Sequence, residues 1–259
     1  MTDLRYTAER VLAVKQWVPG KLFSIRTTRS PEFSFKPGQF ARLGLPATGT
    51  DSAAAEPTIW RGFSMVNEPD ADYLEFYAVV VPEGEFSPQL AQLQEGDTLY
   101  VDKTAFGFLT LDNFPNGGES LWLLATGTGL SAYLSMLKQE QTWNLFSKVI
   151  LCHGVRHIEE LNYQEDIQAC QDKFAERFVY LPLPTRQAYQ DYPQARLTEL
   201  IQDNRLAELA QTALDPEKAC IMLCGNPDML SDARKILGDK GFATGRRGNI
   251  GNLAVEKYW

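Results

Sequence analysis

Hydrophobic and polar residues follow two different patterns along the 259 residues of this chain. Up to about residue 111, short stretches of alternating or β-branched residues are separated by turns that contain glycine or proline. Short strands at this spacing are typical of an antiparallel β-barrel. We expect strands at residues 7–18, 21–28, 40–45, 61–64, 73–81 and 96–101, and a short helix at residues 88–93 that Ser87 caps.

The second pattern begins near residue 120, where continuous apolar runs alternate with helical stretches. Such alternation predicts a doubly wound α/β domain with a parallel sheet. We therefore predict two domains, a β-barrel over residues 1–111 and an α/β domain over residues 112–259, joined by the linker-like residues 113–118. The expected strands of the second domain are 121–125, 148–152, 178–183 and 219–224, and its expected helices are 130–139, 159–175, 197–204, 206–213 and 228–240.

Composition and charge narrow the class of protein. A hydrophobic content of 44% with 22% charged residues is typical of a soluble globular protein. The net charge of −8 argues against nucleic acid as the partner, because phosphate binding needs a basic face. No apolar run approaches the roughly 20 residues that cross a membrane. Charged residues stand where a signal peptide has its apolar core, so we expect a cytoplasmic protein.

The cysteines do not predict a metal site. Cys220 and Cys224 are close in sequence, whereas Cys152 and Cys170 are isolated. On a strand, Cys220 and Cys224 would lie about 13 Å apart on one face, too far for a shared metal or a disulfide. We predict no metal.

A glycine-rich segment lies between an expected strand and an expected helix. Residues 127–132 read Gly-Thr-Gly-Leu-Ser-Ala, which fits the pattern G-x-G-x-x-G/A. Glycines let backbone N–H groups approach a phosphate, and a helix N-terminus adds positive potential. In this context the motif favours nucleotide binding over a plain tight turn, and the predicted contacts are Gly127, Thr128 and Gly129.

Two further features bear on the nucleotide. No acidic residue ends the second expected strand, and Arg156 stands just beyond it, followed by Arg186 and Arg196. Arginines suit a 2′-phosphate, so NADP is favoured over NAD, although each arginine alone also fits a solvated surface charge. The turn after the fourth expected strand lies where ligands gather in such sheets. Its nucleotide-binding candidates are Gly225, Asn226 and Met229, and Cys224 either packs in the core or lines the nicotinamide pocket.

Residues 61–64 read Arg-Gly-Phe-Ser and combine three useful groups in one strand. An arginine pairs with phosphate, an aromatic ring stacks on a planar ring, and a hydroxyl hydrogen-bonds a heterocycle. By itself the tetrapeptide also fits a buried strand end. The interpretation changes when later motifs are considered with the tetrapeptide. These motifs follow in the order Gly-x-x-Ser-Pro, Gly-Thr-Gly, Cys-Gly-Asn-Pro and a terminal aromatic residue.

In this order the motifs resemble those of the flavodoxin/ferredoxin–NADP⁺ reductase family, in its bacterial type whose chain ends in Tyr-Trp. The resemblance covers nearly the whole chain. It implies that the barrel binds FAD and that the second domain binds NADP(H). It also implies catalytic roles for Ser64, Cys224 and Trp259, with Trp259 covering the flavin face where nicotinamide must land.

The resemblance further implies the contacts of FAD. Arg61 would meet the diphosphate, Phe63 would stack on the isoalloxazine, and Ser64 would lie near its reactive nitrogen. Other implied FAD contacts are Phe76, Tyr77, Ala78, Val79, Glu85, Phe86, Ser87, Thr128 and Trp259. The chain departs from the family pattern in having Phe63 for the usual tyrosine, Gly62 for alanine, and the acidic Glu85 close to a phosphate.

The resemblance implies an enzyme that exchanges a hydride between NADP(H) and FAD and single electrons between FAD and ferredoxin or flavodoxin. We expect a monomer. Alternatives are an NADPH-dependent reductase module of another electron-transfer system and a non-catalytic NADP(H) sensor. An acidic carrier would need a basic patch, for which Arg26, Arg29, Arg246 and Arg247 are candidates.

Overall fold

The computed structural model describes residues 4–47, 56–245 and 250–257. The chain divides into two compact units, Met1–Gly107 and Phe108–Trp259, each with its own hydrophobic core. The division falls ahead of the predicted boundary at residues 111 and 112. It follows Gly107, whose φ of +96° lies in the left-handed region that favours glycine.

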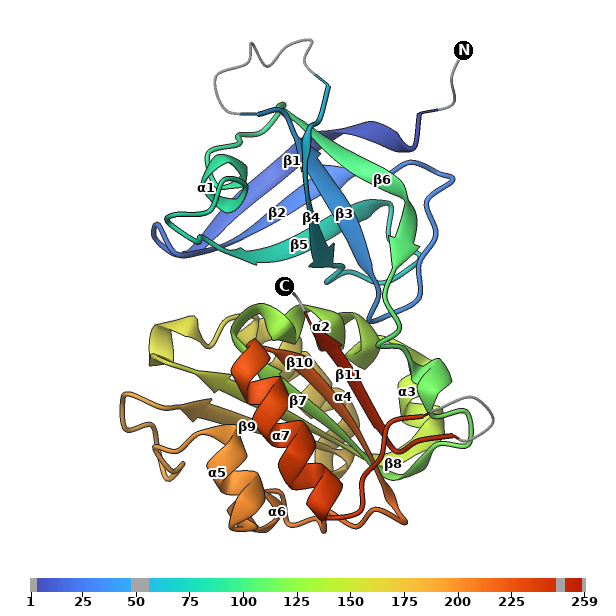
Figure 1. Ribbon diagram of the computed structural model, residues 1–259, viewed down its shortest axis with the longest axis vertical. Helices are drawn as coiled ribbons and strands as arrows, with labels where there is room; N and C mark the ends of the chain where they lie inside the picture. Colours follow the sequence, from blue (N-terminus) through green and yellow to red (C-terminus); the bar gives the residue numbers. More distant parts are fainter. Residues whose placement is uncertain (1–3, 48–55, 246–249, 258–259) are drawn as a thin grey trace. The chain divides into compact units, whose positions relative to one another are not determined.

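The first unit is a six-stranded antiparallel sheet, as the sequence predicts (Figure 1). The strand order is β4-β3-β6-β1-β2-β5, and an isolated bridge joins Met65, directly after β4, to Phe76 in the middle of β5. The sheet therefore curls toward a barrel. The strands are β1 (Tyr6–Val18), β2 (Leu22–Thr28), β3 (Phe40–Leu45), β4 (Ile59–Ser64), β5 (Tyr73–Val79) and β6 (Thr98–Phe106).

Period-two alternation places one face of these strands in the core of the barrel unit. Phe23 and Ile25 of β2 pair with Ala78 and Phe76 of β5, and at most 1% of each of the four residues is exposed. Burying side chains of this size stabilises the fold by about 1.5–3 kcal/mol each, except for the smaller alanine.

The helix of the first unit begins earlier than expected. Helix α1 spans Ser87–Leu90, its N-cap is Phe86, and no side chain caps it. The prediction that Ser87 caps a helix from residue 88 is wrong. The Ser87 hydroxyl instead accepts a hydrogen bond of 2.8 Å from the backbone N–H of Val81, which joins the helix to the preceding loop.

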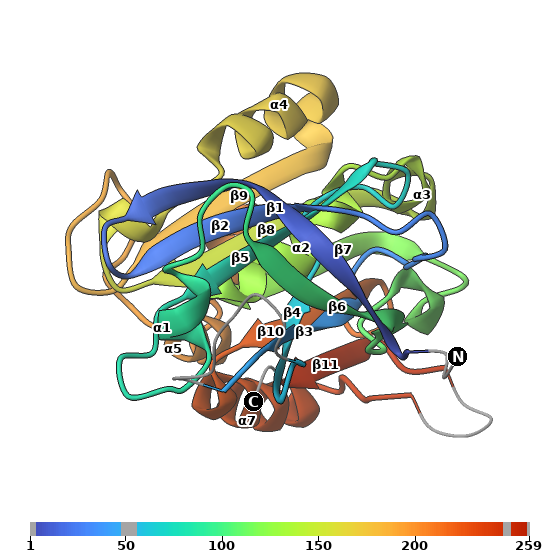
Figure 2. The ribbon, with the colours of Figure 1, turned by 90° about the horizontal axis from the view of Figure 1, so that it is seen from above.

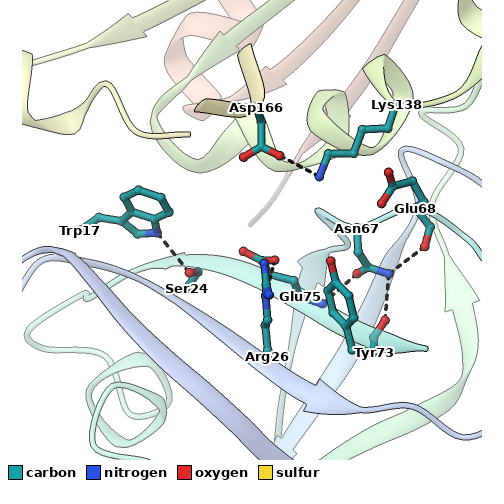
Figure 3. Close-up of polar contacts among 9 residues, drawn as sticks. All are labelled: Trp17, Ser24, Arg26, Asn67, Glu68, Tyr73, Glu75, Lys138 and Asp166. Atoms are coloured by element: carbon teal, nitrogen blue, oxygen red, sulfur yellow. Dashed lines mark hydrogen bonds and ion pairs between the residues drawn. The ribbon is translucent and has the colours of Figure 1, made fainter. Parts of the chain in front are cut away.

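Asn67 organises the connection between β4 and β5 (Figure 3). Its side chain is completely buried, and its Nδ2 donates to the carbonyls of Glu68 and Tyr73, both at 2.9 Å. Its Oδ1 accepts from the backbone N–H of Glu75 at 2.8 Å. One amide therefore holds both ends of the turn, and with it the relative position of β4 and β5.

The second unit contains a five-stranded parallel sheet in the order β11-β10-β7-β8-β9, which confirms the predicted doubly wound fold. Strand β11 was not expected. Its five residues pair with β10 in register from Ile221–Leu253 to Gly225–Lys257. The strands are β7 (Gly118–Thr126), β8 (Phe146–Val155), β9 (Phe178–Pro184), β10 (Ala219–Gly225) and β11 (Leu253–Lys257).

Helices cover both faces of this sheet (Figures 1 and 2). Helices α2 (Leu130–Leu137), α3 (Glu140–Leu145) and α4 (Gln164–Phe174) lie on one face. Helices α5 (Leu197–Gln202), α6 (Arg205–Ala210) and α7 (Pro227–Asp239) lie on the other. The described residues of this unit also form short 3₁₀ turns: η1 (Leu111–Asn113), η2 (Gly127–Gly129), η3 (Ile158–Glu160) and η4 (Ala175–Arg177).

The predicted helix at residues 159–175 is divided into η3 and α4. Tyr163 separates them with a φ of +59°, a left-handed conformation that interrupts helical hydrogen bonding.

Lys138, directly after α2, forms an ion pair of 2.9 Å with Asp166 of α4 (Figure 3). No helix in the part of the chain that the structure describes is long and apolar enough to cross a membrane.

Candidate functional site

The strand order of the α/β unit creates a switch point between β7 and β10. From β7 the chain winds outward through β8 and β9, and later returns to place β10 and β11 on the other side of β7. Ligands of open α/β sheets bind at the carboxyl ends of the strands beside such a point. The glycine turn η2 follows β7, and the turn at Asn226 follows β10, so the two predicted nucleotide-binding segments meet there.

Glycine is required where these two turns touch. A Cβ atom on Gly129 would lie 2.5 Å from the carbonyl oxygen of Cys224. Gly225 has a φ of +131°, and a Cβ there would lie 2.2 Å from Oγ1 of Thr126. The same Oγ1 accepts a hydrogen bond of 2.8 Å from the backbone N–H of Asn226. Contact between backbones therefore holds the two turns together.

The side chains of the second turn are largely committed to the fold. Oδ1 of Asn226 caps α7 by accepting from the backbone N–H groups of Asp228 and Met229 at 2.9 and 3.2 Å. Met229 packs in the hydrophobic core, and Cys224 is completely buried. Nucleotide contacts by Gly225, Asn226 and Met229, and a nicotinamide contact by Cys224, stay predictions.

The predicted 2′-phosphate clamp begins at the ends of two neighbouring strands. The backbone N–H of Arg186, after β9, donates to the carbonyl of Arg156, after β8, at 3.0 Å. Arg196 precedes α5, where its backbone N–H donates to Glu199 at 3.0 Å. All three arginines are exposed, and none forms an ion pair with another described residue. Two of the three candidates are thus brought side by side.

His153 is a residue of this site that the sequence interpretation passed over. It lies on β8 with 0% exposure, and its Nε2 is 3.0 Å from the carbonyl oxygen of Gly127 in the glycine turn. Burial lowers the pKa of His153 to about 4, so the imidazole is neutral near pH 7. The sequence carried a weak signal, a histidine inside an apolar strand run, which spacing cannot connect to a turn 26 residues away.

The end of β4 carries the three groups predicted to bind FAD. Arg61 is exposed, and its Nη1 donates to its neighbour's carbonyl at 2.8 Å. Phe63 is half-buried, with its ring centroid 5.8 Å from that of Phe86. Ser64 is 2% exposed, and its Oγ has no hydrogen-bond partner. A buried hydroxyl without a partner, at the end of a strand that also carries an aromatic ring, fits a planar heterocycle that bears hydrogen-bonding atoms.

The other predicted FAD residues of the first unit differ in what they expose. On β5, Phe76 and Ala78 belong to the barrel core, Tyr77 is buried, and Val79 is half-buried. In the α1 segment Glu85 is exposed, whereas Phe86 and Ser87 are buried. A ligand at β5 would therefore contact the backbone of the strand, because the side chains of Phe76 and Ala78 are in the core. Their roles, like that of the buried Thr128 on the other unit, stay predictions.

Several predicted residues lie outside the described part of the chain. These are Tyr258 and Trp259 of the tail and Arg246 and Arg247 of the proposed basic patch. Among the described residues, no group of three or more His, Cys, Asp and Glu side chains could hold a metal ion.

Glu256, near the end of β11, is a second residue that the sequence interpretation missed. Its Oε1 accepts from the backbone N–H of Phe108 at 3.1 Å, and Oε2 is buried without a partner. Burial raises the pKa of Glu256 to about 7, and the nearby backbone N–H groups of Phe108 and Leu109 oppose this rise. The strand that carries it was itself not predicted, so its burial could not be foreseen.

Comparison with known proteins identifies the family. Residues 123–235 match the family described as oxidoreductase NAD-binding domain. The chain is 37% identical to ferredoxin–NADP reductase A of Sorangium cellulosum, over 97% of this chain and 90% of that protein. It is 34% identical to the flavodoxin/ferredoxin–NADP reductase of Escherichia coli, over 96% of this chain and 97% of that protein.

A solved structure agrees with these relatives. The ferredoxin NADP⁺ reductase of Neisseria gonorrhoeae, with bound FAD and NADP, superposes with a TM-score of 0.90 at 34% identity, over 99% of this chain and all of that one. The glycine turn at the switch point, the β4 triplet and full-length similarity to these enzymes agree. The chain belongs to the ferredoxin/flavodoxin–NADP reductase family.

Proposed function

We propose that the protein is a flavoenzyme that exchanges a hydride between NADP(H) and FAD and single electrons between FAD and ferredoxin or flavodoxin. The relatives named above carry this activity in their names, and the Neisseria structure holds both nucleotides. The observation that carries the proposal on this chain is the buried, unpartnered hydroxyl of Ser64 at the end of β4, directly after the half-buried Phe63 in the sequence. FAD, when bound, supplies the redox chemistry.

The barrel unit would hold FAD through residues of different chemistry. The exposed guanidinium of Arg61 is suited to the diphosphate, and the ring of Phe63 to stacking on the isoalloxazine. The hydroxyl of Ser64 would hydrogen-bond a heteroatom of the isoalloxazine, which gives this buried group the partner that it lacks.

The α/β unit would hold NADP(H) at the switch point. Turn η2 continues directly into α2, and the first N–H groups of a helix have no partner within the helix. Together with the helix dipole they suit the diphosphate of the nucleotide. The exposed Arg156, Arg186 and Arg196 would bind the 2′-phosphate, which favours NADP(H) over NAD(H).

The proposal includes a monomeric, cytoplasmic enzyme whose partner is a small ferredoxin or flavodoxin. The net charge of −8 means that an acidic carrier needs a local basic surface on this enzyme. NADPH turnover is measured with purified ferredoxin and, separately, with purified flavodoxin. The physiological carrier should give the higher kcat/KM. Gel filtration tests the monomer, and cell fractionation tests the location.

The central test combines a spectrum with turnover. The purified protein should carry or take up one FAD per chain, with the visible absorption bands of oxidised flavin, and NADPH should bleach them. Ser64→Ala should keep the fold and weaken FAD retention or slow the bleaching. Protein that binds NADPH but takes up no FAD would contradict the proposal and favour a nucleotide sensor.

Coenzyme choice gives a second test. Arg156→Ala or Arg186→Ala should raise the KM for NADPH and leave that for NADH nearly unchanged. Losing one charge-assisted contact of about 1.5–3 kcal/mol corresponds to a rise of about ten- to a hundredfold. Arg234→Ala, at an exposed arginine of α7, is the matched control and should change neither KM. Equal effects of Arg156→Ala on both coenzymes would contradict the assignment.

A further inference from the structure

His153, on the neighbouring strand β8, contacts the glycine turn that follows β7. It is completely buried on β8, and its Nε2 is 3.0 Å from the carbonyl oxygen of Gly127. Because a carbonyl oxygen only accepts, the hydrogen of this bond belongs to Nε2. In the neutral imidazole Nδ1 is then a bare acceptor, and it is buried with no partner. The bond to Gly127 therefore selects one tautomer of the ring.

The direction of the Gly127 carbonyl determines the direction of the next backbone N–H in the turn. This carbonyl also accepts from the backbone N–H of Leu130, three residues further on, as in a 3₁₀ turn. The peptide bond that follows is planar and trans, so its N–H, that of Thr128, points opposite to the carbonyl. A bond that fixes the direction of the Gly127 carbonyl thereby fixes the direction of the Thr128 N–H.

Packing does not fix Gly127, in contrast to its neighbour Gly129. A Cβ on Gly127 would meet no heavy atom within 4 Å, whereas one on Gly129 would lie 2.5 Å from a carbonyl oxygen. Gly127 also has a φ of +54°, where glycine keeps its wide conformational freedom. The conformation at the start of the turn is thus fixed by hydrogen bonds rather than by steric packing around Gly127.

The other bonds of the turn hold different atoms. Ser131 Oγ donates to the carbonyl of Thr128 at 2.8 Å, and the backbone N–H of Asn226 donates to Oγ1 of Thr126 at 2.8 Å. These bonds tie the turn to its own helix and to β10. His153 ties the turn to β8, and it is the side chain that, together with the backbone N–H of Leu130, holds the Gly127–Thr128 peptide.

We propose that His153 is a positioning residue for nucleotide binding: its neutral imidazole holds the Gly127–Thr128 peptide so that the Thr128 N–H points toward the diphosphate of NADP(H). This inference rests on the proposed function. His153 touches neither the nucleotide nor the reacting atoms, and it acts through the backbone. Since a diphosphate is bound alike before and during the reaction, the effect falls on nucleotide affinity and KM rather than on kcat.

The test compares two replacements of His153 in the FAD-loaded, full-length protein. His153→Gln keeps an N–H donor near the position of Nε2, whereas His153→Met has a similar volume and no donor. The dissociation constant of NADP⁺ is measured by calorimetry, and KM and kcat are measured with NADPH. His153→Met should weaken NADP⁺ binding about three- to tenfold and raise the KM by the same factor with kcat unchanged. His153→Gln should restore the affinity to within about twofold of the wild type.

A control separates positioning from stability. Ile150→Val removes one methylene from a completely buried side chain on the same strand. Ile150 lies three residues before His153, so its side chain points to the opposite face of the sheet. The variant should lower the melting temperature and leave NADP⁺ binding unchanged. Wild-type affinity in His153→Met, or an equal loss of affinity in Ile150→Val, overturns the inference and leaves the proposed function standing. A wild-type protein that binds no NADP⁺ overturns both.

Discussion

At the scale of single residues, three buried polar atoms in the described part of the chain have no hydrogen-bond partner: Ser64 Oγ, His153 Nδ1 and Glu256 Oε2. Each such atom costs about 1–3 kcal/mol of stability. Ser64 lies at the proposed FAD site, and His153 supports the turn proposed to bind NADP(H). Glu256 carries the carboxylate that holds the backbone of Phe108. Two of the three costs therefore fall on segments with proposed functions, where local rules of stability are most often broken.

Glu256 should make stability depend on pH. Its folded-state pKa, about 7, lies above the unfolded value of 4.5, so the folded protein holds a proton that the unfolded chain has lost between these values. Stability contributed by this group is present below pH 4.5 and is lost as pH rises to about 7, by at most about 3 kcal/mol. Glu256→Gln should therefore match the wild type near pH 4.5 and exceed it by about 2 kcal/mol at pH 8, in urea unfolding at both pH values.

Glu119→Gln is the control for this comparison, because the Glu119 side chain is 67% exposed. Its difference from the wild type should stay nearly constant between pH 6 and pH 8. If the curves of stability against pH for Glu256→Gln and the wild type run parallel, the carboxylate of Glu256 does not titrate as its burial indicates.

At the scale of elements, Gly62 of β4 shows how a neighbouring strand constrains a motif. The family resemblance described above implies alanine at the position of Gly62. Here a Cβ would lie 2.9 Å from Cδ2 and 3.0 Å from Cε2 of Phe40 on β3. The Phe40 ring in turn stacks on Phe106 of β6, with centroids 5.9 Å apart. The glycine is thus matched to an aromatic pair that crosses the sheet beside the proposed FAD site.

Gly62→Ala should therefore destabilise the protein by about 1–2 kcal/mol, because the stacked Phe40 ring must move. Gly238→Ala is the matched control on α7, where a Cβ would meet nothing within 4 Å. It should stabilise by up to about 1 kcal/mol, the helix preference of alanine over glycine. Thermal unfolding of both variants checks that their changes in stability have opposite signs. A Gly62→Ala variant more stable than the wild type would show that the Phe40 ring moves aside without strain.

At the scale of the whole molecule, the chain consists of two units with separate cores. The proposed FAD contacts among the described residues lie in the barrel unit, apart from Thr128. The proposed NADP(H) contacts lie in the α/β unit, at the ends of β7, β8, β9 and β10 and, for Arg196, at the start of α5. The proposal therefore assigns most of each nucleotide's contacts to one unit.

This division predicts two different patterns of amide hydrogen exchange. FAD should slow exchange mainly in β4 and at residues 85–87, and NADP⁺ should slow it in η2 and the turn after β10. At a ligand concentration 100 times Kd, local opening should become about a hundredfold rarer, or about 2.7 kcal/mol less favourable. Peptide-resolved mass spectrometry of the protein with each nucleotide measures this. Protection by NADP⁺ confined to the barrel unit would contradict the proposed sites.

Much of the fold could be predicted from the sequence, because it depends on periodicity and composition. The apolar runs at residues 121–125 and 148–152 are long and uninterrupted enough to identify buried parallel strands. Alternating residues and glycine turns identify the antiparallel strands before residue 111. The ordered motifs of residues 61–64, 127–132 and 224–229 identify the family because each is local in sequence and chemically distinctive.

Tertiary structure decided what depends on contacts between distant segments. Strand β11 has only five residues and is a strand because β10 pairs with it, and Ser87 accepts from Val81 because α1 packs on that loop. His153 meets Gly127 only because β8 lies beside β7. Burial, pairing and loss of partners are properties of the packed sheet, so no local pattern could reveal that Ser64, His153 and Glu256 each keep a buried polar atom without a partner.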